Sequence, residues 1–451
     1  MYKVELYRKH IIVSDDVNDA VINTLTNELF FCEKSHAKTE IKESEFPCYN
    51  KEDLRIDASN CEVDGVTICA AETCNMRCTY CFANAGSYNT EHGRAISEES
   101  LAKIREVLWK INANGVKSIH FFGGEPLLAK REIFRFCGAL LDEYKQKGLE
   151  APHFSLTTNA SLITDNIARL LKKYHVSVCV SIDGPEEIHD RRRIFRDGTG
   201  TFQKTMTGIR KLQKENIPPV AEATVSVKDF SDMSKDAMYR FFDFFREAEI
   251  CAVAFFMDVN EKDSDLDIIA AIEHFYQSLT DYYFDLLTQE NQKPNDTIIF
   301  TNVLSAILKI LSNTEPTVCM AGLSQVFLTA NGDIYPCQTY YASRKTLMGS
   351  IDDIIAYECA RQSVEKDIAN RVSAECLQCS YYRYCENKCP GSNLLATGKE
   401  SQVSRPLCYA AQSLVNHVIY RLAKLGNAPE AYQIFIERLH KAAAAAQVLG
   451  G

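Results

Sequence analysis

GVTICAAETCNMRCTYCFA, residues 65–83, is the stretch that decides the fold. A short apolar strand runs directly into a loop in which Cys74, Cys78 and Cys81 have the spacing C-x3-C-x2-C. In βα barrels the chemistry takes place at the carboxyl ends of the strands, which is where this loop begins. Three thiolates so close together can bind three irons of a cube-shaped iron–sulfur cluster and leave one iron without a local protein ligand. Taken alone, the loop could also be a zinc site completed by a distant His, or a chance spacing in a Cys-rich chain.

The region that follows this strand alternates between short β-rich runs and amphipathic segments of helical period, from Val66 to about Glu290. The expected strands are GVTICAA, SIHFF, HFSLTT, VSVCVSI, AEATVSV and CAVAFFM. The expected helices are residues 98–112, 128–147, 165–173, 202–215, 232–248 and 266–287. Several strands are apolar on both faces, which is typical of a parallel sheet covered by helices. The pattern predicts an α/β protein with a partial (β/α)6 barrel.

The remaining chain divides into smaller parts around a barrel at residues 66–300. Residues 1–65 are expected to be a small appendage with strands at KVELY and HIIV and one helix at residues 17–28. Residues 316–410 are rich in Cys, Tyr and turn residues, so bound metal is expected to replace a large core there. Residues 411–451 are expected to form two helices split at Gly426.

The composition describes an ordinary globular protein with room for two or three domains. Of its 451 residues, 46% are hydrophobic and 24% are charged, and the formal net charge is −10. An acidic chain is not expected to bind nucleic acid or anionic lipid nonspecifically. The sequence has no apolar run near the roughly 18 residues of a membrane span, and its start lacks the apolar segment of a signal peptide. We therefore predict a cytoplasmic protein without a nucleic-acid or membrane partner.

Eighteen cysteines are the unusual feature of the composition. Disulfide scaffolds are short secreted chains, so thiolate chemistry or metal ligation explains the cysteines of this long chain better. Ten of them fall into spaced groups: Cys74, Cys78, Cys81, Cys319, Cys337, Cys376, Cys379, Cys385, Cys389 and Cys408. The others are interpreted as small hydrophobic residues without a further role: Cys32, Cys48, Cys61, Cys69, Cys137, Cys179, Cys251 and Cys359.

Three further motifs follow the later strands of the predicted barrel. Gly123-Gly124-Glu125-Pro126 follows the second strand, Thr157-Thr158-Asn159 ends the third, and Ser181-Ile182-Asp183-Gly184-Pro185 ends the fourth, with Arg193 beyond it. Glycines permit close approach of the backbone, and a carboxylate can accept from an ammonium group. A hydroxyl and a guanidinium suit a carboxylate. On its own each motif could be a turn or a solvated basic loop.

Together with the cysteine loop, these motifs resemble those of the radical S-adenosylmethionine (SAM) enzymes. The resemblance implies that the following residues bind SAM: Tyr80, Gly123, Gly124, Glu125, Pro126, Asn159, Ser181 and Arg193. Arg191, Arg192 and Arg196 lie close to Arg193 in the sequence, so the choice of arginine rests on the resemblance. The family's cluster passes one electron to SAM, and the resulting 5′-deoxyadenosyl radical removes a hydrogen atom from the substrate.

The cysteines of residues 316–410 resemble the SPASM domain of peptide-modifying radical SAM enzymes. Cys319 and Cys337 fit C-x12-G-x4-C, and the group from Cys376 to Cys389 fits C-x2-C-x5-C-x3-C, with Cys408 downstream. The resemblance implies two auxiliary clusters, and hence three [4Fe–4S] clusters in all. Its ligand sets are Cys376, Cys379, Cys385 and Cys408 for the distal cluster, and Cys319, Cys337 and Cys389 for the nearer one. Zinc is the alternative for this domain.

Two glutamines separate this chain from some SPASM relatives. Gln325 stands where some relatives have a fourth ligand to the nearer cluster, and Gln338 stands where sulfatase maturases have an Asp that is proposed as a base. An iron without a fourth protein ligand could bind a substrate thiolate, and it could equally bind water or one of the scattered cysteines. Gln338 cannot be a base. The favoured reaction is therefore an intramolecular thioether crosslink in a Cys-containing precursor peptide made on the ribosome.

The sequence leaves other functions open. The enzyme alternatives are a maturase that forms carbon–carbon crosslinks and an anaerobic sulfatase-maturating enzyme that oxidises Cys or Ser. The non-enzyme alternative is an iron–sulfur or zinc scaffold, or an electron carrier. An external one-electron donor such as flavodoxin or ferredoxin is an expected partner. Residues 1–65 could be a reduced module that binds the leader of the peptide, or a plain structural extension.

Overall fold

The structure is a computed structural model, and it describes residues 2–7, 10–24, 27–40, 61–89, 93–258, 266–289, 298–312 and 318–450. The chain forms two compact units. The first unit contains residues 1–54, 224–318 and 372–451, and the second contains residues 55–223 and 319–371. Within the described residues the structure has no disulfide bond, and Cys48 lies outside these residues.

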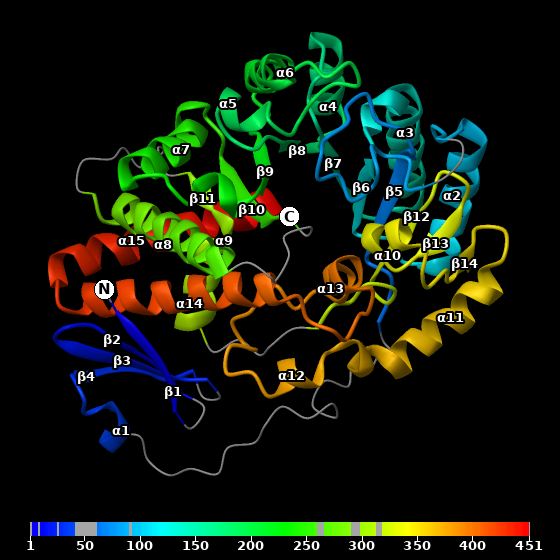
Figure 1. The fold of residues 1–451 in the computed structure, drawn as a ribbon. Helices are drawn as coiled ribbons and strands as arrows, with labels where there is room; N and C mark the ends of the chain where they lie inside the picture. Colours follow the sequence, from blue (N-terminus) through cyan, green and yellow to red (C-terminus); the bar gives the residue numbers. More distant parts are fainter. Residues whose placement is uncertain are drawn as a thin grey trace. The chain divides into compact units, whose positions relative to one another are not determined.

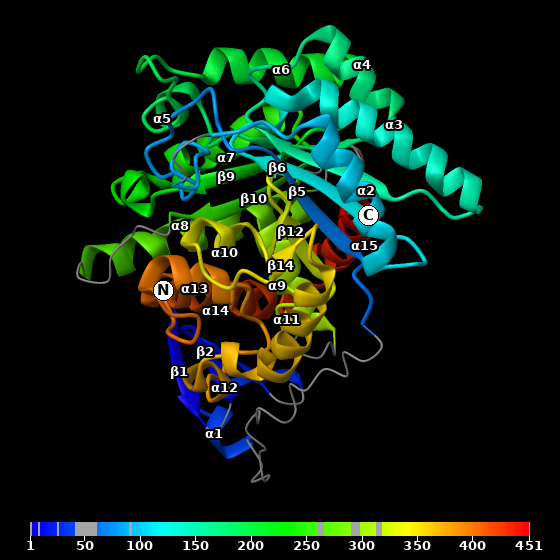
Figure 2. The same cartoon turned by 90° about the vertical axis from the view of Figure 1, so that its right-hand side faces the viewer.

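The second unit is built on parallel strands that alternate with helices (Figures 1 and 2). Neighbouring strands, in order, are β5 (Gly65–Ala71), β6 (Ser118–Gly123), β7 (His153–Thr158), β8 (Ser177–Ser181) and β9 (Val220–Val225). The helices are α2 (Glu98–Ile111), η2 (Pro126–Ala129), α3 (Lys130–Lys147), α4 (Asp165–Lys173), α5 (Glu186–His189) and α6 (Phe202–Lys214). The predicted α/β class is confirmed.

The helices of this unit begin and end where local chemistry dictates. The Ser97 hydroxyl caps the first turn of α2 by accepting from Ser100 N at 3.0 Å, and Thr164 caps α4 in the same way. Gly148 ends α3 in the left-handed conformation, with φ of 70°. The strands bury one face completely, with Phe121 and Leu156 at 0% exposure. On β6, β7 and β8 the side chains of the other face are only partly buried.

A later segment extends the same sheet. Strand β12 (Gln325–Leu328) runs parallel to β5, with Gln325 opposite Gly65, and β13 (Asp333–Tyr335) and β14 (Gly349–Ser350) continue it antiparallel. Helices α10 (Gln338–Ser343) and α11 (Ile354–Asp367) and the short η4 (Ile368–Arg371) complete the unit. Backbone hydrogen bonds thus join the segment that carries Cys319 and Cys337 to the strand that leads into the cysteine loop.

The first unit opens with an antiparallel sheet, and one expectation about it is wrong. Strands β1 (Lys3–Tyr7) and β2 (His10–Ser14) are confirmed, but the helix expected at 17–28 is β3 (Asn18–Asn23) followed by β4 (Leu29–Glu33). The β-branched residues of β3 pair with β2 and bury Val21 against Ile12. Cross-strand packing outweighs the helical spacing of the apolar residues. A short helix, α1 (Ala37–Glu40), packs on this sheet.

The rest of the first unit is mainly helical. Its elements are η3 (Val227–Phe230), α7 (Lys235–Glu247), β10 (Ala252–Met257), α8 (Leu266–Thr288), β11 (Ile299–Phe300), α9 (Thr301–Leu311), α12 (Ala374–Leu377), α13 (Pro390–Thr397), α14 (Arg405–Gly426) and α15 (Pro429–Gly450). A buried aromatic core joins α7, α8, β10 and β11, where the rings of Phe242, Phe255, Phe275 and Phe300 stack or meet edge to face.

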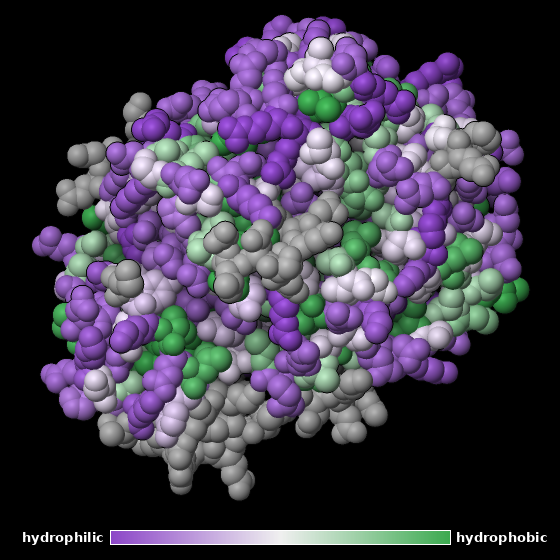
Figure 3. All heavy atoms as spheres, viewed as in Figure 1, coloured by the Kyte–Doolittle hydropathy of each residue, from purple (hydrophilic) through white to green (hydrophobic). Residues whose placement is uncertain are grey.

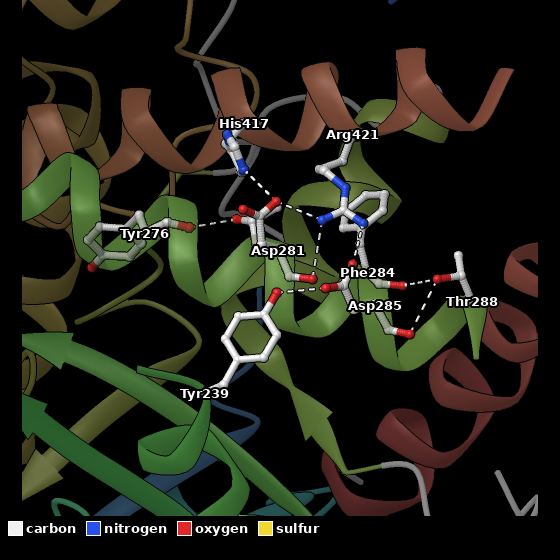
Figure 4. Close-up of polar contacts among 9 residues, drawn as sticks. Tyr239, Tyr276, Asp281, Phe284, Asp285, Thr288, His417 and Arg421 are labelled. Atoms are coloured by element: carbon white, nitrogen blue, oxygen red, sulfur yellow. Dashed lines mark hydrogen bonds and ion pairs between the residues drawn. The ribbon is translucent and has the colours of Figure 1, made fainter. Parts of the chain in front are cut away.

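Helices α8 and α14 are held together by charged side chains (Figure 4). Asp281 on α8 accepts hydrogen bonds from His417 Nε2 at 2.9 Å and from Arg421 at 2.6 Å. Asp285, one turn later, accepts from Arg421 at 2.7 Å and from the Tyr239 hydroxyl at 2.6 Å. Burial alone would raise the pKa of Asp281, but these partners outweigh it and lower the pKa to about 2. We call this group of residues the α8–α14 clamp.

The described surface is largely hydrophilic on the face shown in Figure 3, where apolar residues lie in patches between polar ones. Among the described residues, the structure has no helix that is both long and apolar enough to cross a membrane.

Candidate functional site

The cysteine loop follows β5 in the second unit and is fixed by a second stretch of backbone. Arg77 N donates to Ile194 O at 2.8 Å, and Thr79 N donates to Arg192 O at 3.0 Å. These bonds hold the loop against residues 192–196, which come from the segment beyond β8. The thiols of Cys74, Cys78 and Cys81 are partly buried in this arrangement.

The two glycines of the Gly-Gly-Glu-Pro turn let this turn pack against the cysteine loop. A Cβ on Gly124 would lie 2.3 Å from Thr73 O, and a Cβ on Gly123, where φ is +137°, would lie 2.4 Å from Ala71 O. A Cβ on Gly86, after the cysteine loop, would lie 2.5 Å from the Cα atom of Gly124. The space that the absent side chains leave is taken by neighbouring backbone atoms.

Glu125 is completely buried and well satisfied by hydrogen bonds. Its Oε1 accepts from the Thr158 hydroxyl at 2.7 Å and from Leu127 N at 3.0 Å, and its Oε2 accepts from Asn159 N at 2.8 Å. Burial raises the pKa of Glu125, and these three hydrogen bonds oppose that rise. Glu125 thus ties the turn after β6 to the end of β7, and it also caps η2, where Pro126 is buried.

Asn159 connects the end of β7 to the cysteine loop. Its side-chain nitrogen donates to Asn75 Oδ1 at 2.9 Å and lies 3.8 Å from Cys74 Sγ. Asn75 in turn donates to the Ser161 hydroxyl at 2.9 Å. The end of β7 therefore fixes the first cysteine of the loop from one side.

Arg193 is buried in a polar group with Asp183 and Tyr80. Its Nε donates to Asp183 Oδ1 at 3.1 Å, and the Tyr80 hydroxyl donates to Asp183 Oδ2 at 2.6 Å. The guanidinium lies over the Tyr80 ring at 5.5 Å and 4.0 Å from Cys78 Sγ. Burial opposes its charge, but the nearby Asp183 carboxylate outweighs this and raises the pKa of Arg193. A fixed positive charge therefore stands beside the cysteine loop.

The neighbouring arginine, Arg196, has a different position. It is exposed, and its Nε donates to Cys74 O at 3.0 Å. It supports the backbone of the cysteine loop, whereas Arg193 is the arginine that is buried among Tyr80, Cys78 and Asp183.

Ser181 lies at the end of β8, on the partly exposed face of the sheet, opposite Glu222 of β9. This face is lined with polar side chains. His120 contacts the Ser155 hydroxyl at 2.8 Å and the Thr157 hydroxyl at 3.2 Å. Burial lowers the pKa of His120 to about 4, so its ring is neutral at pH 7. Ser181 therefore stands at the edge of a surface that offers hydroxyls and an imidazole to a polar ligand.

Burial disfavours the free thiolate form of two cysteines of the loop. Burial raises the pKa of Cys74 to about 12 and also raises the pKa of Cys78. A thiol in such a place loses its proton when a metal cation compensates its charge. A cube takes one thiolate on each iron, so its ligands surround it. Among the described residues, no three Cys, His, Asp or Glu side chains meet at a point that could hold a single ion.

The model of the Radical SAM superfamily matches residues 68–242, which include the cysteine loop, Glu125 and Arg193. Residues 68–242 are a radical SAM domain. The protein is therefore an enzyme of radical SAM chemistry, for which this family implies one [4Fe–4S] cluster and SAM as cofactors.

Curated relatives extend beyond the radical SAM domain. The cysteine-type anaerobic sulfatase-maturating enzyme of Clostridium novyi is 25% identical over 71% of this chain and 86% of its own length. The radical SAM cyclopropyl synthase TigE of Paramaledivibacter caminithermalis is 24% identical over 93% of this chain and 89% of its own.

Two solved structures share the fold. The sulfatase-maturating enzyme anSMEcpe with bound SAM superposes with a TM-score of 0.64 at 21% identity, covering 81% of this chain and 99% of that chain. SuiB of Streptococcus suis, bound to the precursor peptide SuiA, has a TM-score of 0.52 at 16% identity, covering 90% of this chain and 100% of that chain. The chain thus shares the fold of these two enzymes.

Beyond the radical SAM domain, four of the remaining grouped cysteines come together in the first unit. Cys376, Cys379, Cys385 and Cys408 lie close enough for their charges to interact. Burial, followed by these mutual interactions, raises the pKa of Cys376 to about 12.

The other three grouped cysteines are placed as follows. Cys319 and Cys337 belong to the second unit, and Cys337 precedes α10, with its Sγ 2.9 Å from the Thr339 hydroxyl. Cys389 belongs to the first unit, where its Sγ accepts from Ser392 N at the start of α13.

Two features of the radical SAM domain were missed by sequence reasoning. Asp183 is the hydrogen-bond partner of both Tyr80 and Arg193, although the sequence indicated it only as part of a motif. The signal that could have identified it is that a buried arginine needs a carboxylate partner. Glu72, between β5 and Cys74, is buried and accepts from the Tyr341 hydroxyl of α10 at 2.6 Å. Because 269 residues separate these two, no local pattern indicates the contact.

Proposed function

We propose that the protein is a maturase of a ribosomally made precursor peptide, on which it installs an intramolecular thioether between a Cys sulfur and a carbon. The single observation that carries the proposal is the gathering of Cys376, Cys379, Cys385 and Cys408 in one unit of a chain that also has a radical SAM domain. A second buried thiol site of this kind distinguishes SPASM-type enzymes from radical SAM enzymes with one cluster. SuiB, which shares the fold, was solved with its precursor peptide.

We assign the radical cluster to Cys74, Cys78 and Cys81 and the cofactor contacts to the residues around them. When bound, the cluster supplies the electron that cleaves SAM. Arg193 Nε donates to Asp183, so we assign its terminal nitrogens as the donors for the SAM carboxylate. The Ser181 hydroxyl is the second donor for that carboxylate. Glu125 retains acceptor capacity on Oε2 for the SAM ammonium. Tyr80, Gly123, Gly124, Pro126 and Asn159 shape this site.

We assign two auxiliary [4Fe–4S] clusters to the remaining grouped cysteines. Cys376, Cys379, Cys385 and Cys408 supply a full set of four thiolates to the distal one. The nearer cluster takes Cys319, Cys337 and Cys389, and the exposed Gln325 of β12 stands in the sequence where some relatives supply a fourth ligand. A substrate thiolate is a chemically suitable fourth ligand, since thiolates are soft ligands.

The reaction balances as a loss of two hydrogens. One hydrogen atom leaves the substrate carbon to the 5′-deoxyadenosyl radical, and the thiol of the substrate loses a proton. The carbon–sulfur bond would then form with release of one electron, which a one-electron carrier such as flavodoxin or ferredoxin would finally accept.

Sulfatase maturation is the second candidate, favoured by the similarity to the Clostridium novyi enzyme. Gln338, the first residue of α10 after Cys337, weighs against it, because a carboxamide cannot take the proton that this oxidation releases. A carbon–carbon crosslink is the third candidate, in line with the similarity to the cyclopropyl synthase TigE.

The test is co-expression of the protein with each small Cys-containing reading frame next to its gene, followed by mass spectrometry of the peptide with and without a thiol-alkylating reagent. A thioether lowers the mass by two hydrogens and blocks alkylation of one Cys per crosslink. The same mass loss with every thiol alkylated indicates a carbon–carbon link, and an aldehyde that reacts with a hydrazine indicates sulfatase-type chemistry. Either result overturns thioether formation.

A further inference from the structure

Asn27 joins the β3–β4 hairpin of the N-terminal sheet to the end of α9. Its side-chain nitrogen lies 3.1 Å from Lys309 O, 3.0 Å from Ile310 O and 2.5 Å from Ser312 O. These are carbonyls at the end of a helix, where no intrahelical donor remains. Asn27 has a positive φ of 60°, which asparagine tolerates better than most residues. The N-terminal sheet thus supplies a C-terminal cap to a helix nearly 300 residues away in the chain.

The same side chain also contacts the cysteine-rich loop of the first unit. Asn27 Oδ1 accepts from the Tyr384 hydroxyl at 2.7 Å, and Tyr384 immediately precedes Cys385. A carboxamide can donate to carbonyls through its nitrogen and accept from a hydroxyl through its oxygen. Asparagine is therefore the residue type that fits this position, because an aspartate would place its charge against three carbonyl oxygens.

Helix α9 holds the loop from a second side. Its Ser305 hydroxyl and Lys309 ammonium both contact the Glu386 carboxylate, next to Cys385. Burial alone would raise the pKa of Glu386, but these two partners outweigh it and lower the pKa. The residues on both sides of the Cys385 peptide, Tyr384 and Glu386, are thus fixed to α9 or to the hairpin that caps it.

The fourth thiol of this group is positioned by a different device. Cys408 lies in the first turn of α14, where its backbone N–H donates to Ser404 O. The α8–α14 clamp holds that helix further along (Figure 4). One thiol is therefore placed by a long, clamped helix, whereas Cys385 depends on a short loop that the N-terminal sheet and α9 hold.

We propose that the N-terminal sheet is a structural part of the distal cluster site, and that Asn27 is the positioning residue through which it fixes the loop of Cys385. This inference rests on the distal cluster of the proposed function and concerns its stability. It assigns to the N-terminal sheet a role other than binding the leader of a peptide.

The test uses full-length protein reconstituted with iron and sulfide under anaerobic conditions. The variants are Asn27→Asp, which keeps the acceptor for Tyr384 but repels the carbonyls of α9, and Tyr384→Phe, which removes the hydroxyl alone. Loss of one such buried bond corresponds to about a 5- to 30-fold change in an equilibrium. We expect both variants to lose up to about four of roughly twelve irons per chain, together with one auxiliary cluster signal in EPR.

Two controls make the effect specific. Tyr283→Phe removes another buried hydroxyl of the first unit, one without a hydrogen-bond partner in the described structure, and should keep all the iron. SAM cleavage without peptide should be unchanged in every variant, because the cysteine loop, Glu125 and Arg193 all lie in the other unit.

The outcomes separate this inference from the proposed function. Full iron and an unchanged EPR spectrum in both Asn27→Asp and Tyr384→Phe would overturn the positioning role. Loss of all clusters together, with loss of SAM cleavage, would also overturn it, in favour of a general effect on folding. A wild-type protein with only one cluster would refute the proposed auxiliary clusters before any variant is made.

Discussion

Arg193 shows how burial selects one residue among several similar ones. Four arginines lie between residues 191 and 196, and only the environment distinguishes them. Arg193 is 8% exposed and shares Asp183 with the Tyr80 hydroxyl, whereas Arg196 is exposed and supports the cysteine loop through Cys74 O. A buried guanidinium with one carboxylate partner keeps donors for a second anion.

Arg193→Ala should weaken SAM binding without loss of iron. Removal of one partner of a charged hydrogen bond costs about 1–3 kcal/mol, or roughly 5- to 150-fold in affinity. Glu125→Ala should weaken binding by a similar factor. Equilibrium dialysis with labelled SAM measures both, and Arg210→Ala, at an exposed position on α6, is the control. An unchanged affinity for Arg193→Ala combined with a defect in Arg192→Ala or Arg196→Ala would assign the carboxylate to another arginine.

The three cysteines of the loop should act as one unit. Replacement of Cys74, Cys78 and Cys81 by Ala should remove about one third of the iron and all formation of 5′-deoxyadenosine, because one cube of four irons depends on them. Iron analysis and liquid chromatography measure the two effects. Cys137→Ala, a buried cysteine in α3, is the matched control and should change neither. Residual 5′-deoxyadenosine in the triple variant would contradict the assignment.

At the scale of elements, we expect the α8–α14 clamp to contribute to the stability of the protein. Asp281→Asn should lower the unfolding free energy by about 1–2 kcal/mol at pH 7, allowing for the partial exposure of the carboxylate. Because the folded pKa of about 2 lies below the value of about 3.9 in an unfolded chain, this contribution is present above pH 4 and is lost as the pH falls toward 2. The difference in melting temperature from wild type should therefore shrink as the pH is lowered from 4 toward 2. Asp142→Asn, exposed on α3, should cause no shift; a shift as large as that of Asp281→Asn would contradict the clamp.

Helices with a clear apolar period and an N-cap residue could be predicted from the sequence, whereas elements without these signals could not. Helix α4 is found at Asp165–Lys173, the predicted residues, because Thr164 caps it and one apolar face is buried. Helix α11 was not expected: within its described residues only Tyr357 and Val364 are buried, so its apolar pattern is faint. Strand β3 was predicted as a helix because the spacing of its apolar residues also fits a helix. Its antiparallel pairing with β2, which makes it a strand, is a tertiary contact that the spacing does not indicate.

The site was predictable to a similar degree. The motifs placed the cysteine loop, the turn of Glu125 and the region of Arg193 at the strand ends, and the structure brings these three together. The Asp183 partnership and the Tyr341 contact to Glu72 depend on packing between distant segments, which periodicity does not report. The packing of the two glycines against Thr73 and Ala71 is also a tertiary feature.

For the whole molecule, the ten grouped cysteines predict about twelve irons per chain after anaerobic reconstitution, as three cubes of four. Iron and sulfide analysis, with Mössbauer spectroscopy, measures the number and type of clusters. The variant that replaces Cys376, Cys379, Cys385 and Cys408 by Ala should retain about eight irons and should still cleave SAM. Zinc at any of these sites in place of iron would contradict the cluster assignment there.

The pairing of β5 with β12 has a consequence for how the protein is made. Gly65 lies opposite Gln325, so the edge of β5 gains its partner only after about 260 further residues have been synthesised. At 5–20 residues per second the ribosome needs roughly 13–52 s for that length. During this interval the strand that leads into the cysteine loop presents an open edge, to which other chains can add. Yields of the intact enzyme should therefore fall as the concentration of nascent chains rises, because the open edge of β5 then meets more neighbours before β12 arrives.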